Sequence, residues 1–215
     1  MLKMLIRVLC SACLVLLLTG QSTAEMIVNG SFESPPLPQY EHVPGGATTI
    51  TGWLTVDSGV ERFNPSDPGV GFGGTPVGFA QTGTLAIDLA IFTGGGIQQT
   101  FGTLPGAWYR VEFYGGTLEG FNRDGTGQIE ALVNSVPRTF FNVVNHSPTI
   151  VWSLFSFDFQ ATGSTTTLEF RNRQDHLRHF AFIDSVSVNV PEPSTVVLLA
   201  TGVVGLLITR CRRWR

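Results

Sequence analysis

The chain has 215 residues, of which 43% are hydrophobic and 13% charged, and its formal net charge is −3. This total hides an acidic central region, because residues 25–190 contain seven Arg, no Lys and fifteen Asp or Glu, a formal charge of −8. An acidic region without Lys argues against a nucleic-acid partner. The region also lacks Cys, so its stability must come from a hydrophobic core, helped at most by a metal.

The first 24 residues have the three parts of a secretory signal peptide. Lys3 and Arg7 give a positive start, residues 9–18 are almost wholly apolar, and residues 22–24 supply the small side chains of a cleavage site. The sequence therefore predicts export and a mature chain that begins at Glu25. The alternative is an uncleaved N-terminal anchor, for which the apolar run is short.

The central region alternates apolar and polar residues in several short runs. The clear cases are residues 109–113, 128–133, 154–159, 167–170 and 182–190. Alternation with period two predicts strands that bury one face, and Gly- and Pro-containing turns separate these runs. Strands of this kind, about eight to ten in number, without helical segments predict an all-β fold, a β-sandwich or jelly roll, over residues 25–189.

The end of the chain consists of a short motif, an apolar run and a basic tail. The motif is Val190, Pro191, Glu192, Pro193 and Ser194; residues 195–209 are uncharged; and the tail carries Arg210, Arg212, Arg213 and Arg215. Fifteen helical residues span about 22 Å, less than the roughly 30 Å membrane core, so the sequence predicts a marginal transmembrane helix with a cytoplasmic tail. The alternative is a buried C-terminal strand or helix, against which the four arginines argue.

This C-terminal pattern, V-P-E-P-S-T followed by an apolar run and R-C-R-R-W-R, resembles the PEP-CTERM sorting signal. The resemblance implies recognition by an exosortase, removal of the tail, and transfer from the inner membrane to the cell surface. It is typical of Gram-negative bacteria that make exopolysaccharide.

The central region resembles the choice-of-anchor C type of surface domain, which is similar to galactose-binding-like β-sandwiches. The resembling segments are N-G-S-F-E at 29–33, G-W at 52–53, L-A-I-D-L at 85–89, and the segments 96–113, 155–170 and 183–188. The Gly- and Pro-rich stretch 64–79, which predicts a surface loop, and the basic stretch 171–179 are less typical. The resemblance implies a fold, an anchoring habit and contact with carbohydrate, but no enzyme.

The two ends of the domain carry candidate ligands for a metal. Residues 29–33 enter the predicted first strand and Asp184 begins the last, and these strands often lie side by side in a jelly roll. We therefore expect Glu33 and Asp184, with Asn29 as a weaker third ligand, to hold Ca²⁺, which prefers oxygen ligands. The resemblance also implies a structural calcium near this place. The alternative is a turn at Asn29 and a solvated Glu33.

Trp53 is the candidate for ligand binding. It follows Gly52 near a loop, where an exposed ring can stack on the apolar face of a sugar. The alternative is core packing, which is the commoner fate of a tryptophan.

Several catalytic motifs are missing from the sequence. It has no G-x-S-x-G nucleophile elbow, no P-loop and no Cys/His zinc pattern. We therefore expect a non-enzymatic surface protein that associates with extracellular matrix or exopolysaccharide, binding a glycan there. The alternatives are a purely structural spacer and a carbohydrate-active hydrolase that uses paired carboxylates, such as Asp57 with Glu61 or Asp88 with Glu112.

Overall fold

The computed structural model describes residues 26–70, 74–90 and 94–191 of the chain. Residues 25–190 form one compact unit, and the core described below lies within it, so this unit can fold by itself. The predicted signal peptide, the sorting motif from Glu192 onward, the predicted helix at 195–209 and the basic tail lie outside the described residues. Within the described ranges, no helix is long and apolar enough to cross a membrane.

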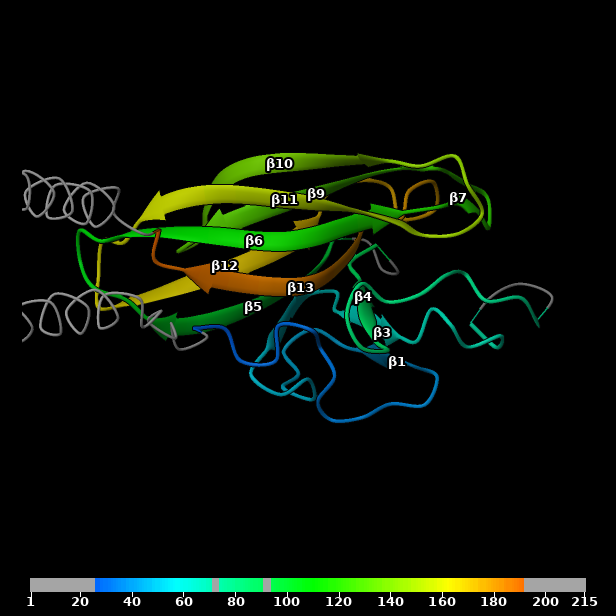
Figure 1. Ribbon diagram of the computed structural model, residues 1–215, viewed down its shortest axis with the longest axis horizontal. Coiled ribbons are helices and arrows are strands. Elements are labelled where there is room, and N and C mark those ends of the chain that lie inside the picture. Colours follow the sequence, from blue (N-terminus) through cyan, green and yellow to red (C-terminus); the bar gives the residue numbers. More distant parts are fainter. Residues whose placement is uncertain (1–25, 71–73, 91–93, 192–215) are drawn as a thin grey trace, which may run out of the picture. The chain divides into compact units, whose positions relative to one another are not determined.

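The described residues form thirteen strands, most of which build two antiparallel sheets packed face to face (Figure 1). One sheet has the order β1 (Tyr40–Val43), β3 (Val60–Phe63), β4 (Ala86–Asp88), β13 (Phe182–Asn189), β6 (Trp108–Thr117) and β11 (Val151–Gln160). The other has the order β10 (Val136–Val144), β9 (Thr126–Val133), β12 (Thr165–Asn172), β5 (Gly95–Gly102) and β2 (Leu54–Asp57). A separate hairpin joins β7 (Glu119–Gly120) to β8 (Arg123–Asp124). The prediction of an all-β sandwich is confirmed.

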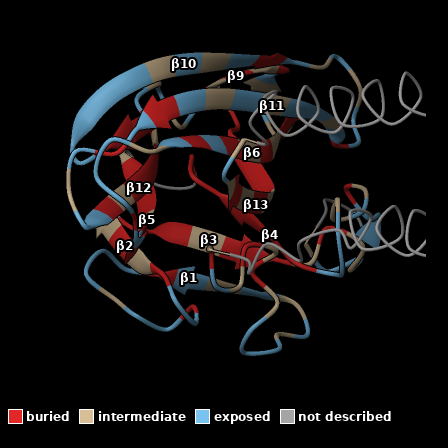
Figure 2. Cartoon of the chain, turned by 60° about the vertical axis from the view of Figure 1, so that its left-hand side comes forward, coloured by how far each residue is buried: buried red, intermediate tan, exposed pale blue. Residues whose placement is uncertain are grey.

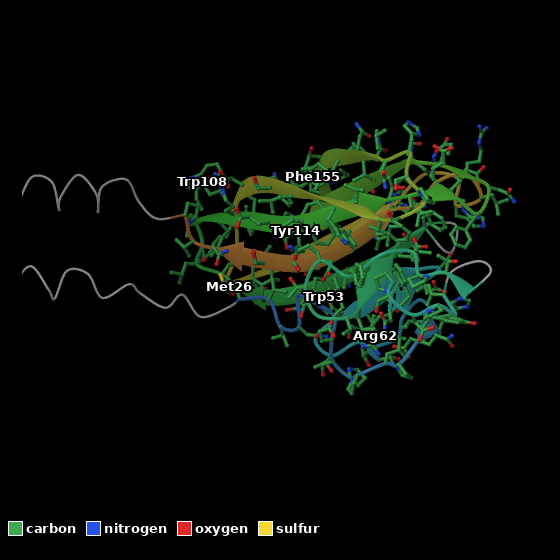
Figure 3. All side chains as sticks on the ribbon, turned by 45° about the vertical axis from the view of Figure 1, so that its right-hand side comes forward. Met26, Trp53, Arg62, Trp108, Tyr114 and Phe155 are labelled. Atoms are coloured by element: carbon green, nitrogen blue, oxygen red, sulfur yellow. The ribbon has the colours of Figure 1, made fainter. Side chains whose placement is uncertain are left out.

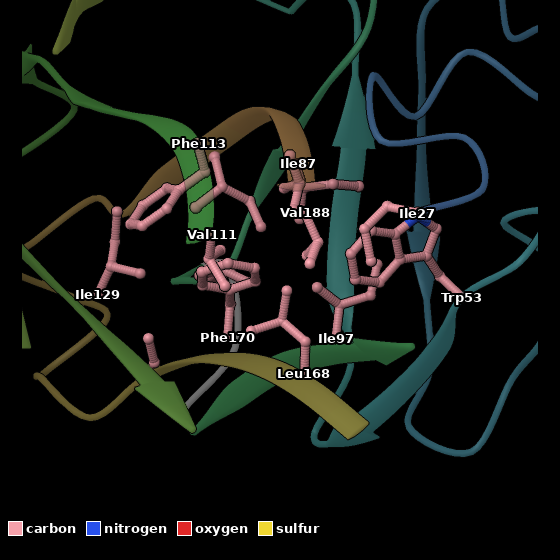
Figure 4. Close-up of a cluster of buried hydrophobic side chains, with 14 of the residues drawn as sticks. Ile27, Trp53, Ile87, Ile97, Val111, Phe113, Ile129, Leu168, Phe170 and Val188 are labelled. Carbon is pink, nitrogen blue, oxygen red and sulfur yellow. The ribbon is translucent and has the colours of Figure 1, made fainter. Parts of the chain in front are cut away.

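The five strands predicted from alternation all correspond to observed strands, namely β6, β9, β11, β12 and β13; the run at 182–190 extends one residue beyond β13, which ends at Asn189. On β6, Val111 and Phe113 are buried between the sheets, whereas Arg110 faces solvent (Figure 2). The Phe113 ring packs 4.7 Å from the ring of Phe170 on the opposite sheet, measured between centroids, and Phe141 and Phe155 pack against it too. This layer of aromatic and aliphatic side chains fills the sandwich (Figure 4) and holds a domain that has no disulfide.

The prediction that residues 29–33 enter a strand is wrong, because they form a turn. Asn29 has a positive φ of 54°, and its side-chain amide donates to the carbonyl oxygens of Ser34 and Thr51. The turn nevertheless lies against the last strand, since the backbone N–H of Val186 donates to the carbonyl of Gly30 at 2.9 Å. The two ends of the domain therefore meet, as the jelly-roll argument predicted.

The outer face of the six-stranded sheet carries a second, smaller apolar cluster. Phe63, Ala86 and Phe182 point outward from β3, β4 and β13, opposite to the main core. They are covered by side chains from the loop at 64–79, from the β7–β8 hairpin and the residue before it, from β11 and the residue before it, and from the segment before β13, namely Val70, Val77, Leu118, Phe121, Ile150, Trp152 and Phe180. This cluster supports a cavity on the same face.

Candidate functional site

The outer face of the six-stranded sheet holds a half-open cavity of about 460 Å³, called here the outer-face cavity. Strand residues form its floor: Tyr40, His42, Glu61, Phe63, Asp88 and Phe182. The loop at 64–79 and the β7–β8 hairpin form its walls, with one residue that precedes β13: Gly69, Val70, Val77, Leu118, Phe121, Asn122, Arg123 and Phe180. The volume is in the usual range for a small-ligand pocket.

Three polar side chains lie next to one another on the cavity floor. Glu61 and Asp88 are directly opposite residues of the β3–β4 ladder, so both side chains leave the sheet on the same face. Glu61 also faces His42 across the β1–β3 ladder, and a hydrogen bond of 2.6 Å joins its carboxylate to the imidazole Nε2. Two carboxyl groups and one imidazole thus form a continuous polar strip across three strands.

The two carboxyl groups have different environments. Asp88 is only 2% exposed, and burial raises its pKa to about 8; the nearby charge of Glu61 adds to this effect, and Arg123 opposes it. Burial also raises the pKa of Glu61, but the charge of His42 and the hydrogen bond with it favour the ionised form. At neutral pH Asp88 is therefore mostly protonated and can donate a hydrogen bond, while Glu61 is better placed to accept one.

The β7–β8 hairpin contributes the aromatic side chain of Phe121 to the cavity wall, and its turn has an unfavourable backbone conformation. Its two connecting residues, Phe121 and Asn122, both have positive φ, 56° and 65°, as a two-residue type I′ turn requires. A bulky residue such as Phe rarely adopts this conformation. Arg123 follows, with its guanidinium carbon 4.7 Å from the centroid of the Phe180 ring and its Nη1 donating to the Phe121 carbonyl. Strain of this kind is common where a segment is shaped for function.

The carboxylate pairs named under the hydrolase alternative, Asp57 with Glu61 and Asp88 with Glu112, do not come together in the cavity, because neither Asp57 nor Glu112 lines it. Asp57 lies outside the cavity and forms ion pairs with Arg171 and Arg173, at 3.1 and 3.7 Å. The cavity instead combines one member of each predicted pair, Glu61 and Asp88. Only the register of β3 against β4 brings them together, and alternation within single strands does not reveal that register.

The prediction that Trp53 offers an exposed stacking surface is also wrong. Its side chain is 2% exposed and lies among the core residues (Figure 4), and its indole N–H donates to the Asn29 carbonyl. Trp108, at the start of β6 and labelled with Trp53 in Figure 3, is exposed instead. Trp152 donates its indole N–H to the Phe79 carbonyl and so ties the loop at 64–79 to β11.

The predicted calcium ligands Glu33 and Asp184 do come together, around residues 81–85. Asp184 is fully buried and accepts hydrogen bonds from the backbone N–H groups of Gln81, Thr82 and Ser185. Burial raises its pKa to about 7 against these bonds, and the charge of Glu33 adds to the rise.

Glu33 also binds the backbone of this segment. It accepts from the backbone N–H groups of Thr84 and Leu85 and from the Thr84 hydroxyl. Because N–H and O–H donors surround all four carboxylate oxygens of Glu33 and Asp184, this arrangement does not fit a cation, and Asn29 is used in its own turn. Among the described residues, no three His, Cys, Asp or Glu side chains gather into a group that could hold a metal.

A comparison with protein families identifies the family to which the domain belongs. The model of a family described as "Protein of unknown function (DUF642)" matches residues 25–189. The chain belongs to the DUF642 family. The PEP-CTERM protein-sorting motif matches residues 189–213, which confirms the recognition of the C-terminal signal and marks this DUF642 protein as an exported one. No curated protein matches the chain significantly.

One solved structure supports the fold of this DUF642 domain, and two others are more distantly similar to it. A cyclase from Fischerella sp. TAU, in complex with 4-(1H-indol-3-yl)butan-2-one, has a TM-score of 0.53 at 16% identity, over 78% of this chain and 97% of that one. The CBM22-1 xylan-binding domain of Paenibacillus barcinonensis Xyn10C has a TM-score of 0.43 at 11% identity, over 72% and 94%. A family 35 carbohydrate binding module from Clostridium thermocellum has a TM-score of 0.42 at 12% identity, over 69% and 97%. At such identities the likeness concerns the fold alone.

Proposed function

We propose that this DUF642 protein is a non-enzymatic surface protein that binds an extracellular glycan in the outer-face cavity. The observation that carries the proposal is the cavity itself, which combines a strip of carboxyl and imidazole groups with the aromatic side chains of Tyr40, Phe121 and Phe180. Sugars present hydroxyl groups that need acceptors and donors, and apolar ring faces that pack on aromatic side chains. The cavity supplies both kinds of contact.

The contacts can be assigned to particular residues. Glu61 accepts hydrogen bonds from ligand hydroxyls, and protonated Asp88 donates one. Tyr40 is 47% exposed at the edge of the floor, so its ring is available for stacking. Phe121 offers a second aromatic surface from the hairpin on the opposite wall.

Binding is tested on the purified fragment 25–190 with a panel of polysaccharides and oligosaccharides, by calorimetry. We expect Tyr40→Ala and Glu61→Gln each to weaken binding by about tenfold, as for loss of one good contact in a small site. Asp158→Asn is the matched control, because its partner Arg110 and the residue itself lie outside the cavity. Binding that the cavity variants leave intact would place the ligand elsewhere.

The sorting step is part of the proposal. The PEP-CTERM motif supports recognition by an exosortase, passage through the inner membrane, and a final place in the extracellular matrix, in contact with exopolysaccharide. Deletion of residues 190–215 should release the protein from the cell surface, as followed by fractionation. A deletion variant retained at the surface as before would contradict this part.

A glycan hydrolase is the second candidate, because Glu61 and Asp88 face each other and differ in environment. A protonated Asp88 could protonate a leaving oxygen while Glu61 acts on the sugar or on water. Turnover of any oligosaccharide by the fragment, abolished in Asp88→Asn and in Glu61→Gln, would establish the enzyme. Binding without released product would support the non-enzymatic function.

A further inference from the structure

Arg123 is a half-buried arginine that has no carboxylate partner within the residues that the structure describes. Its acidic neighbour in sequence, Asp124, bonds to Thr126 and His179 instead. Two other arginines without a carboxylate partner are exposed to solvent, and the remaining four each form an ion pair with an Asp or Glu side chain. The exposed ones are Arg138 and Arg178, and the paired ones are Arg62, Arg110, Arg171 and Arg173. Arg123 therefore brings an unpaired guanidinium to the outer-face cavity, which it lines.

The guanidinium of Arg123 also has few acceptors for its five N–H donors. Nη1 donates to the Phe121 carbonyl at 2.8 Å, and the guanidinium carbon lies over the Phe180 ring, 4.7 Å from its centroid. Nε is buried without an acceptor in the described part of the chain, so the charge of this group is only partly solvated. An anion in the cavity would stabilise such a group more than it would stabilise an exposed arginine.

The polar groups of the cavity floor follow a fixed order across the sheet. Glu61 on β3, Asp88 on β4 and Phe182 on β13 are successive partners in the strand register. Phe180 stacks on Phe182, with 5.0 Å between the ring centroids, and Arg123 lies over Phe180. Asp88 therefore lies between Glu61 and Arg123, and the charges of both act on its pKa, in opposite directions.

This order suits a sugar that carries a carboxylate. A carboxylate matches the forked donors of a guanidinium and forms a charge-assisted pair with it. Asp88, mostly protonated at neutral pH, can donate to the same carboxylate or to a neighbouring hydroxyl. Glu61 accepts from hydroxyls farther along the floor. A ligand carboxylate at that end would instead meet the like charge of Glu61, so the arrangement also sets the direction of the sugar.

We propose that the outer-face cavity binds acidic glycans through a uronic-acid residue whose carboxylate pairs with Arg123. This inference rests on the proposed glycan binding and gives it a ligand class. The formal charge of −8 on residues 25–190 opposes an acidic polymer at long range. At physiological salt this repulsion is screened beyond about 8 Å, whereas a contact with a half-buried guanidinium is screened much less. Recognition therefore depends on Arg123 and not on the overall charge of the domain.

Chains of one backbone with and without the carboxylate charge test the ligand class. A hexamer of β-1,4-linked glucuronic acid, its methyl ester and the matching glucose hexamer are titrated into the fragment 25–190 by calorimetry at pH 7 and physiological salt. An array of uronic-acid chains, each beside its methyl ester, covers other linkages. We expect a uronic-acid chain to bind about tenfold more tightly than its ester or neutral counterpart. Equal or tighter binding of the uncharged counterpart would overturn the inference and leave glycan binding standing. No binding to any glycan would contradict the proposed function together with this inference.

Substitution of the arginine provides a second, independent measurement. Arg123→Gln removes the charge but keeps an N–H donor, so the affinity for the uronic-acid chain should fall about tenfold while that for the methyl ester changes little. Arg123→Lys keeps the charge without the fork and should retain part of the preference. Arg138→Gln is the matched control, because this exposed arginine of β10 lies outside the cavity, and melting temperatures show whether each variant is folded. An unchanged ratio of acid to ester affinity in Arg123→Gln would overturn the pairing with Arg123.

Discussion

Replacing Asp88 by Asn should remove most of a steep pH dependence of stability. Burial raises the pKa of Asp88 from its ordinary 3.8 to about 8, so between these pH values the folded chain holds a proton that the unfolded chain releases. Stability contributed by this group is therefore full below pH 4 and is lost as pH rises toward 8. At 1.36 kcal/mol per pKa unit, the difference between 3.8 and about 8 corresponds to an upper limit of roughly 6 kcal/mol.

Asn is a close match to the protonated carboxyl group, because its side-chain oxygen can still accept from the Ala90 backbone N–H and its amide replaces the acidic proton. Urea denaturation of the fragment 25–190 at pH 4.5 and pH 8 measures the effect. We expect wild type and Asp88→Asn to be similar at pH 4.5, and the variant to be several kcal/mol more stable at pH 8.

The comparison separates Asp88 from the other buried carboxyl group, Asp184. Burial raises the pKa of Asp184 to about 7, so this group lowers the stability of both proteins alike as the pH rises from 4 to 7. The difference in stability between the two proteins therefore reports on Asp88. Parallel pH profiles for the two proteins, or a variant that is less stable at pH 8, would refute the assignment of a buried, protonated carboxyl group to the cavity floor.

Three other changes give distinct results. Phe121→Asn relieves the positive φ but removes the ring that packs on Phe180, so the free energy of unfolding should change by less than about 1 kcal/mol while glycan binding weakens in calorimetry; unchanged affinity would show that the hairpin does not contact the ligand. Trp53→Ala should lower the free energy of unfolding by about 3–5 kcal/mol in urea titrations, since it empties a core site, and a small effect would contradict its burial. Because Glu33 binds backbone N–H groups, a chelator should leave the melting temperature unchanged, while Glu33→Gln should lower it by several degrees. If a chelator lowers the melting temperature and Glu33→Ala abolishes that effect, the predicted calcium is established instead.

Alternation predicts strands well in this chain because most of them bury a single face. Leu168 and Phe170 on β12, and Val111 and Phe113 on β6, repeat at period two because the inner faces of both sheets pack together. The segment 29–33 is different. Its Phe32 is buried, but in a turn that approaches β13, and nothing in five residues distinguishes a buried turn from the start of a strand.

The residues of the outer-face cavity were harder to predict from the sequence than the fold was. Glu61 and Asp88 were each considered with a different partner, because their pairing depends on the register between strands that are 22 residues apart in sequence. The prediction of an exposed Trp53 was wrong because a preceding Gly and a nearby turn do not show whether the side chain points into the core or toward solvent. The strain at Phe121 follows from a two-residue connection between β7 and β8, a hairpin too short to show any periodicity.

The outer-face cavity is separate from the main core of the sandwich. The main core fills the space between the sheets, whereas the cavity lies on the outer face and takes its walls from the loop at 64–79 and the β7–β8 hairpin. Substitutions in those walls affect the smaller outer cluster but not the aromatic rings packed around Phe113. Their effects should therefore add nearly independently to the effects of substitutions in the main core. The two segments can therefore vary at little cost to the sandwich, whereas the polar strip on β1, β3 and β4 is fixed by the sheet register.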